Sequence, residues 1–274
     1  MAKRELYDVS DEEFAYFLNA AHGELGRENM PYIFVGGTAV QLQCAKRLCD
    51  IHGVDISTLA SEPKLQSKDV LRLQDHIRAT DDVDLALASS VYEQGSSSPT
   101  QESNGTVSER DVLFYNRVGR VLDGLQREAI SPSEEHILDY RIHRRGVKRP
   151  VFQVYVDGEG GDEQLIAMNL SRQPSDLKSL EDVHYDEFVE RGETLAIPYN
   201  PDFNINARVI SPTDLLAAKT AKFRAKDTMD LHSLADLMRA NGEEVDVEGM
   251  RRILGPEYEH NLQRFISIMN AEHQ

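Results

Sequence analysis

The sequence predicts a mixed α/β (α+β) protein, with a mixed sheet flanked by helices in residues 1–210 and a helical part in residues 211–274. Three observations predict this class. An apolar run at Tyr32–Val35 lies between two segments with helical spacing of apolar residues. Short apolar runs separated by glycine-containing turns follow between residues 150 and 210, which is typical of strands. The helix-start pattern Ser211-Pro212-Thr213-Asp214 then opens the last part.

The first elements follow from caps and spacing. Residues 9–26 predict a helix, because capping residues precede it and acidic residues occupy its first turn. The apolar run 32–35 predicts a strand, and Gly36-Gly37-Thr38 predicts a tight turn after it. The run 39–49 predicts the next helix, and residues 50–77 predict a polar, partly helical insertion.

A second strand is predicted at Val83–Ala88. Low hydrophobicity from about residue 92 to 107 predicts a mobile loop, and apolar spacing predicts a helix from about 107 to 129. Further strands are predicted at 151–156, 164–170, 195–198 and 207–210. From Pro212 onward we expect helices, with interruptions at Asn241-Gly242 and Gly255-Pro256.

The composition limits the possible partners. A hydrophobic content of 40% in 274 residues supports a proper core. The formal net charge of −17 argues against a protein that coats nucleic acid nonspecifically. One basic cluster precedes the strand at 151: Arg141, His143, Arg144, Arg145, Lys148 and Arg149. This cluster fits either a solvated hairpin arm or a contact for a polyanion.

No run of about 18 apolar residues occurs, and the first residues lead into acidic residues rather than an apolar signal segment. We therefore expect no membrane partner and a cytoplasmic location. Cys44 and Cys49 match neither a zinc spacing nor a disulfide framework, so we expect two reduced packing residues.

Two carboxylates in one strand indicate a metal site. Asp82 and Asp84 are two residues apart, so they fall on one face of the strand as like charges. A divalent cation removes that cost, and Mg²⁺ is usually held by one or two carboxylates, water and phosphate oxygens. Gly36 and Gly37 suit the other half of such a site, because a glycine turn before a helix presents free N–H groups to a phosphate. Together they predict a nucleotide-handling site.

The helix that begins at Pro212 carries several charges. If it continues without a break, one face carries Lys219, Lys222, Lys226 and Asp230. The alternative interpretation is an exposed face with a Lys226–Asp230 ion pair worth about 0.3–0.5 kcal/mol.

Three motifs occur in a fixed order: Gly-Gly-Thr-Ala after a strand, Arg-x-Thr-x-Asp-hydrophobic-Asp at 78–84, and Lys-x-x-x-x-Arg-x-Lys-Asp-x-x-Asp-Leu at 219–231. In this order they resemble the minimal nucleotidyltransferases of the polymerase-β superfamily. In particular they resemble the AbiEii-like group, the toxin component of AbiE abortive-infection toxin–antitoxin pairs. The resemblance covers residues 9–240. It implies a polymerase-β-like fold and Mg²⁺-dependent transfer of a nucleoside monophosphate from an NTP to an acceptor.

The resemblance also implies site residues. Catalytic roles fall on four acids and a lysine: Asp82, Asp84, Asp227, Asp230 and Lys219. Nucleotide-binding roles fall on Gly36, Gly37, Thr38, Arg78, Thr80 and Lys222. Asp82 and Asp84 would ligate Mg²⁺, and Lys219, with Lys222 in support, would pair with the β or γ phosphate. Asp230, or Asp227 beside it, would be the late catalytic or orienting acid. Implied partners are an NTP, an RNA acceptor such as a tRNA end, and a cognate antitoxin.

Two other functions stay open. The superfamily's third metal carboxylate belongs on a later strand, where residues 165–170 contain Asn169 and no acid, while Asp157 is read as a turn residue. This departure suggests a catalytically lapsed module that binds a nucleotide or a protein. The acidic composition suggests instead a small-molecule nucleotidyltransferase of the antibiotic-modifying kind, because an acidic cleft attracts cationic substrates.

Overall fold

The computed structural model describes residues 6–66, 70–80, 82–93, 109–128, 139–145, 151–157, 164–171 and 185–271. The strands are β1 (Tyr32–Val35), β2 (Asp82–Leu87), β3 (Asp139–Arg145), β4 (Val151–Asp157), β5 (Gln164–Ser171), β6 (Glu193–Asn200) and β7 (Phe203–Val209). The first helices are α1 (Glu12–Arg27), α2 (Gly36–His52), α3 (Ile56–Ser61), α4 (Leu73–His76), α5 (Ser90–Glu93) and α6 (Glu109–Glu128), with a 3-10 turn η1 (Pro63–Gln66). The later helices are α7 (Tyr185–Arg191), α8 (Pro212–Lys222), α9 (Ala225–Ala240), α10 (Val247–Leu254) and α11 (Glu259–Ala271), with η2 (Pro256–Tyr258).

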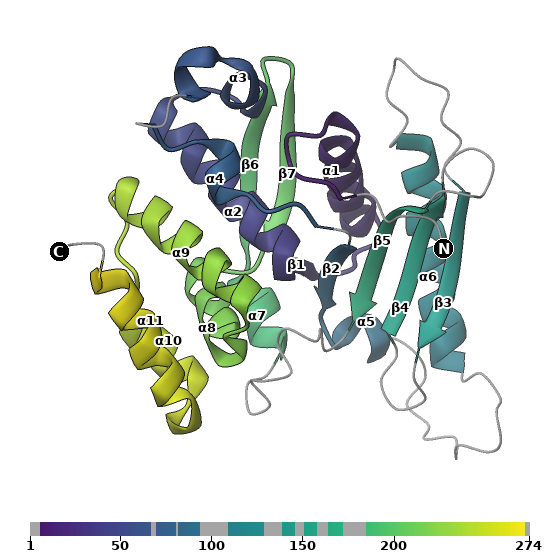
Figure 1. Cartoon of the computed structure of the whole chain (residues 1–274). Coiled ribbons are helices and arrows are strands. Elements are labelled where there is room, and N and C mark those ends of the chain that lie inside the picture. The colour runs from purple at the N-terminus through teal and green to yellow at the C-terminus, as the bar shows by residue number, and fades with distance from the viewer. Residues whose placement is uncertain are drawn as a thin grey trace.

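Within these residues the strands form one seven-stranded mixed sheet in the order β3-β4-β5-β2-β1-β7-β6, seen in Figure 1. The strand β1 runs antiparallel to β2 and parallel to β7, and β2 runs parallel to β5. The predicted mixed sheet flanked by helices is therefore confirmed. The four strands after residue 150 are divided between the two halves of the sheet: β4 and β5 lie on the β2 side, and β6 and β7 lie on the β1 side.

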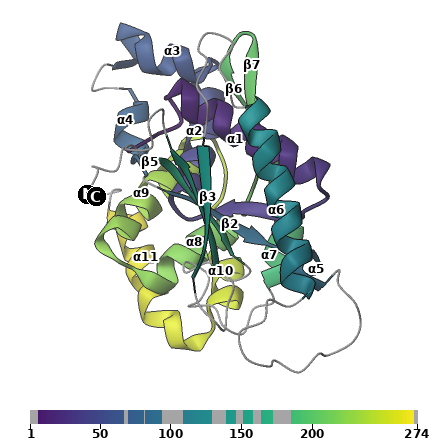
Figure 2. The same ribbon diagram turned by 90° about the vertical axis from the view of Figure 1, so that its right-hand side faces the viewer.

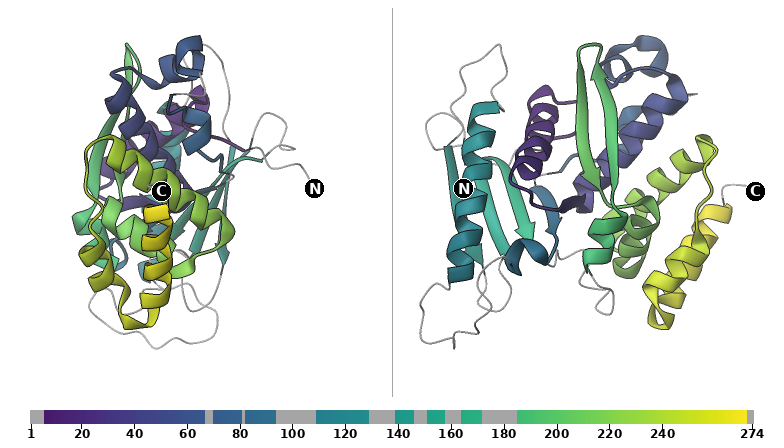
Figure 3. Two further views of the ribbon diagram at one scale, coloured as in Figure 1. Left: turned by 60° about the vertical axis from the view of Figure 1, so that its left-hand side comes forward. Right: turned by 180° about the vertical axis from the view of Figure 1, so that it is seen from behind.

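Helices α1 and α6 pack against each other and cover one face of the sheet. In Figure 2 they lie to one side of β3, with α9 and α11 on the other side, and in the right panel of Figure 3 they stand in front of the strands. On the covered face, Tyr32 of β1 contacts His22 of α1 through its hydroxyl, 2.8 Å from Nδ1. Because strand residues alternate, Phe34 shares this face with Tyr32, and Val35 with its partner Asp84 belongs to the opposite face.

The junction of β1 and α2 corrects one expectation. Gly36 and Gly37 do not form a separate turn, because α2 begins at Gly36 directly after β1. Gly36 has a φ of 68°, a left-handed conformation that glycine adopts without strain. This single residue turns the chain from the strand into the helix.

A second correction concerns the helix that starts at Pro212. The cap is confirmed, since the Ser211 hydroxyl accepts a hydrogen bond from the Asp214 backbone N–H at 3.2 Å. The helix ends at Lys222, however, because Phe223 adopts a left-handed φ of 46°, and α9 begins two residues later. The C-terminal helix α11 supports this break: Arg264 lies 4.2 Å from the centre of the Phe223 ring, and the Asn261 amide donates to the Ala221 carbonyl at 3.2 Å.

The predicted polar, partly helical insertion is also present, as the end of α2 followed by α3, η1 and α4. It carries buried residues, Ile56, Leu59 and Leu73, and α3 packs against β6 while α4 packs against α9. The segment is therefore part of the packed fold rather than surface decoration.

The remaining expectations have mixed outcomes. The helix expected at about 107–129 is confirmed as α6, and the predicted interruptions after α9 and α10 are confirmed. Most of the expected loop at 92–107 lies outside the described residues, although residues 92 and 93 end α5. The basic cluster contributes Arg141, His143, Arg144 and Arg145 to β3, an edge strand whose antiparallel pairing with β4 agrees with the hairpin-arm alternative, while Lys148 and Arg149 lie outside the described residues.

Both cysteines are free and buried, as predicted. Among the described helices, none combines the length and the apolar character that a membrane crossing requires.

Candidate functional site

The strand register brings the first two motifs together. Asp84 of β2 is the direct partner of Val35, the last residue of β1, and the next residue, Gly36, begins α2. Asp84 is half-buried. A carboxylate therefore lies beside the N-terminus of a 17-residue helix, whose first turn contains no acidic residue. The helix dipole and the free N–H groups of that turn favour an anion there.

The neighbouring strand β5 shows what stands beside the carboxylates. Asp84 pairs with Asn169, and Asp82 pairs with Ala167. An amide therefore occupies the position next to Asp84 where the family pattern leads us to look for a third acid. Asp157, which was interpreted as a turn residue, is instead the last residue of β4, where it pairs with Asp139 and Gln164 beside a register irregularity.

The donor set fits a magnesium ion with two protein ligands. Among the described side chains there is no group of three or more histidine, cysteine, aspartate or glutamate residues that could hold a metal; the side chain of Asp82 lies outside that set. Two carboxylates two residues apart on β2 match the usual magnesium pattern, in which water and phosphate oxygens supply the remaining ligands. Such a site is complete only when a phosphate ligand is bound.

Gly37 packs directly against the second motif. A Cβ atom built on Gly37 would lie 3.4 Å from Nη2 of Arg78 and 3.4 Å from Oγ1 of Thr80. Thr38 is fully buried at 0% exposure, and Thr80, which bridges Tyr7 through both backbone groups at 2.8 Å, is 6% exposed. The two threonines are thus part of the packed support, whereas Arg78 is one-third exposed, at 34% of its side chain.

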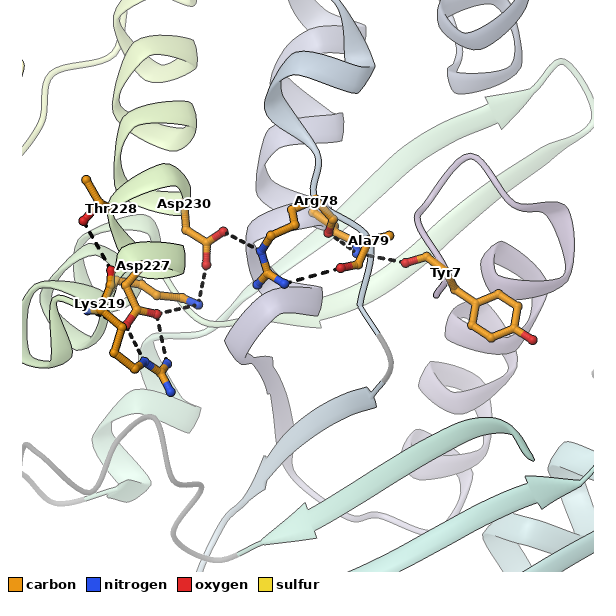
Figure 4. Close-up of polar contacts among 9 residues, drawn as sticks. Tyr7, Arg78, Ala79, Lys219, Asp227, Thr228 and Asp230 are labelled. Atoms are coloured by element: carbon orange, nitrogen blue, oxygen red, sulfur yellow. Dashed lines mark hydrogen bonds and ion pairs between the residues drawn. The ribbon is translucent and has the colours of Figure 1, made fainter. Parts of the chain in front are cut away.

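The third motif forms a charged corner of five side chains where α8 meets α9, most of which Figure 4 labels. Nζ of Lys219 donates to Oδ2 of Asp230 at 2.7 Å and lies 3.6 Å from Oδ1 of Asp227. Nε of Arg78 lies 3.4 Å from the other oxygen of Asp230. Arg224 donates to Asp227 from Nε at 2.6 Å and from Nη2 at 2.9 Å. Three cations and two anions therefore alternate, in the order Arg78, Asp230, Lys219, Asp227 and Arg224.

The middle of the charged corner is closed to water. Lys219 is 3% exposed, Asp227 0% and Asp230 4%. Burial by itself would raise the pKa of Asp227, but the hydrogen bonds from Arg224 and the charge of Lys219 outweigh it and hold that pKa below its ordinary value. The alternation of acidic and basic side chains offsets the cost of burying them.

The expected arrangement of the lysines on one helix face is wrong. Because the chain breaks at Phe223, Lys219 lies on α8 and Asp230 on α9, and the two meet across the break. Lys222 is the last residue of α8, and Lys226 is exposed on α9. The alternative pairing of Lys226 with Asp230 is also displaced, because Asp230 bonds Lys219 instead.

Sequence reasoning missed two supporting residues. Gln41 is 1% exposed, and its amide donates to the carbonyl of Arg78 at 2.8 Å and to that of Tyr7 at 3.2 Å. Its position in the apolar run of α2 was the available signal, since a buried amide needs partners. Arg224 was visible in the third motif, at the i, i+3 spacing from Asp227 that suits an ion pair.

No protein-family model matches the chain, and no curated protein matches its sequence.

Proposed function

We propose that this protein is a Mg²⁺-dependent nucleotidyltransferase of the polymerase-β type, which moves a nucleoside monophosphate from an NTP to an acceptor. The observation that carries the proposal is the pairing of Asp84 with Val35 at the start of α2. Through this pairing an aspartate, which is a common metal ligand, lies next to the N-terminus of a helix, which is a common binding site for phosphate. The third motif, more than 130 residues later in the chain, supports the proposal because its Asp230 contacts Arg78 beside Gly37.

In this proposal the residues of the site have different roles. The N–H groups at Gly36 and Gly37 hold the triphosphate, with Arg78 beside them. Asp82 and Asp84 are the metal ligands. When bound, Mg²⁺ supplies charge neutralisation and orients the phosphate oxygens. The chain itself supplies positioning, because β1, β2 and α2 fix the relative places of the two carboxylates and the helix end.

We propose an RNA acceptor, and with it the role of a toxin in an AbiE-like toxin–antitoxin pair. The strand register supports the acceptor: Arg141 pairs with Tyr155, Tyr155 with Ala167, and Ala167 with Asp82. A residue of the basic strand β3 thus occupies the same row across the sheet as Asp82, three strand spacings or about 14 Å away. A backbone phosphate at β3 would place a nearby nucleotide within reach of the carboxylates.

Two observations favour other functions. The net charge of −17 favours a small cationic acceptor over a polyanion. Asn169 beside Asp84 favours a module that binds a nucleotide without turnover, because an amide neutralises less metal charge than a carboxylate.

The test is label transfer. Purified protein is incubated with Mg²⁺, total cellular RNA and each α-labelled NTP in turn, beside an Asp84→Asn variant and a control variant, Asp50→Asn. Asp50 is also an aspartate, but it forms an ion pair with Lys46 on the last turns of α2, about 20 Å along the helix from Gly36. We expect a discrete labelled RNA band from the wild type and the control, reduced at least about 100-fold by Asp84→Asn, as loss of a metal ligand requires.

The outcomes separate the candidates. Labelling of a small cationic compound but not of RNA would move the acceptor to the small-molecule class. NTP binding without any transfer would support the lapsed module. Equal labelling by the wild type and Asp84→Asn would contradict the proposed site.

A further inference from the structure

The position of Lys219 does not suit a direct contact with a ligand. Its side chain is 4% exposed, and its ammonium group is enclosed by Asp230 at 2.7 Å and Asp227 at 3.6 Å. Moving this ammonium to a phosphate would leave Asp230 with Arg78 alone, at 3.4 Å, and Asp227 with Arg224 alone, and breaking a buried ion pair is destabilising. The ammonium group of Lys219 therefore interacts with the two buried carboxylates rather than with a ligand.

Arg78 differs from Lys219 in each of these respects. A third of its side chain is exposed, and Nη2 lies beside Gly37 in the first turn of α2. Nε faces Asp230 and Nη1 lies 3.4 Å from the Ala79 carbonyl, while Nη2, beside Gly37, is the donor nearest the start of α2. Guanidinium groups are suited to binding phosphate oxygens.

The structure also fixes Arg78 at both ends. Its carbonyl accepts a hydrogen bond from Gln41 at 2.8 Å, and two residues later Thr80 is bridged to Tyr7. Asp230 forms an ion pair with the guanidinium of Arg78, and Lys219 donates a hydrogen bond to Asp230. The contacts form a chain from the interior of the α8–α9 junction to the partly exposed side chain of Arg78.

We propose that Lys219 is a positioning residue that acts through Asp230 on Arg78, and that Arg78 is the cation that contacts the triphosphate. This inference rests on the proposed function, since it assigns roles within the same site. It changes the role that the sequence motif gave to Lys219, from a phosphate ligand to the support of one.

The test is calorimetric binding of each Mg·NTP and of inorganic tripolyphosphate, which requires no transfer activity. Three variants are compared with the wild type: Arg78→Gln, Lys219→Gln and the double variant. Arg78→Gln removes an exposed cation, and Lys219→Gln removes the charge but keeps an amide donor for Asp230. Thermal melting of each variant controls for folding.

We expect Arg78→Gln to weaken binding at least about 10-fold and to reduce its dependence on salt, because a direct ion contact is lost. Lys219→Gln should weaken binding less than about 3-fold and leave the salt dependence unchanged. In the Arg78→Gln background, Lys219→Gln should have no further effect, because a residue that acts only through another is not additive with it.

Equal losses in affinity and in salt dependence for the two single variants, or additive losses in the double variant, would overturn the proposal. Unchanged binding by Arg78→Gln would overturn it even if Lys219→Gln fails to fold. A wild-type protein that binds neither an NTP nor tripolyphosphate would refute the proposed function as well, so the two failures are distinct.

Discussion

Replacing Asp227 by asparagine removes a fully buried charge from the centre of the charged corner. Asparagine keeps the shape and one acceptor for Arg224 but leaves Lys219 with a single carboxylate. Breaking a buried ion pair costs about 3–5 kcal/mol, and we expect about 2 kcal/mol here, since 43% of the Arg224 side chain is exposed and remains solvated. The matched control is Asp236→Asn on the same helix, where Asp236 and Arg239 have the same i, i+3 spacing but are each 29% exposed. That control should cost less than about 1 kcal/mol.

The assay is guanidinium unfolding followed by far-ultraviolet circular dichroism, because the chain contains no tryptophan for fluorescence. The pKa of Asp227 is lower in the folded chain than in the unfolded chain, so its charge contributes stability above the ordinary aspartate pKa, about 3.9. That contribution is lost as the pH falls through the folded pKa. The loss in free energy of unfolding caused by Asp227→Asn should therefore be complete at pH 7 and become smaller below about pH 4. Equal midpoints for the two variants at pH 7, or a deficit unchanged at pH 3, would refute this reasoning.

Three further outcomes are expected. Gly36→Ala should lower the free energy of unfolding by about 1–2 kcal/mol in a denaturant titration, because a φ of 68° strains any residue with a side chain. Gly37→Ala, whose added Cβ would lie at ordinary contact distances from Arg78 and Thr80, should keep the stability of the wild type and lose affinity for tripolyphosphate. Cys44 and Cys49 should not react with a thiol reagent at pH 8 in the folded protein and should both react in denaturant, because burial raises each pKa to about 12. Ser211→Ala should lower the free energy of unfolding by about 1 kcal/mol, since it removes the cap of α8, and an unchanged melting temperature would contradict the capping role.

The fold could be predicted where the signals are local. The strand β1, the helix α6 and the cap at Ser211 follow from runs of apolar residues, spacing and capping chemistry within a few neighbouring residues. Strand β3 was expected only as one of two alternatives, a hairpin arm, because a basic strand at a sheet edge lacks the alternation of apolar residues by which strands are recognised. The separation of β5 from β7 by two central strands is a long-range pairing that no short segment encodes.

The sequence named most residues of the charged corner but did not predict their arrangement. The motifs named Lys219, Asp227 and Asp230, which the structure brings together, but the expected geometry assumed one helix. Neither glycine nor proline marks the break at Phe223, so no local signal announced it. The inward direction of Lys219 is likewise a product of tertiary packing, which spacing along the sequence does not contain.

The support that α11 gives to this break has a consequence for how the protein is made. Residues 1–240 leave the ribosome before Asn261 and Arg264, the two side chains that bear on the junction of α8 and α9. Until they arrive, the left-handed conformation of Phe223, which costs about 1–2 kcal/mol, lacks the support of these contacts. A nascent chain would thus contain every proposed catalytic residue while the angle between its two charged helices is still free. We would therefore expect the junction of α8 and α9 to reach its final geometry only after α11 has been synthesised.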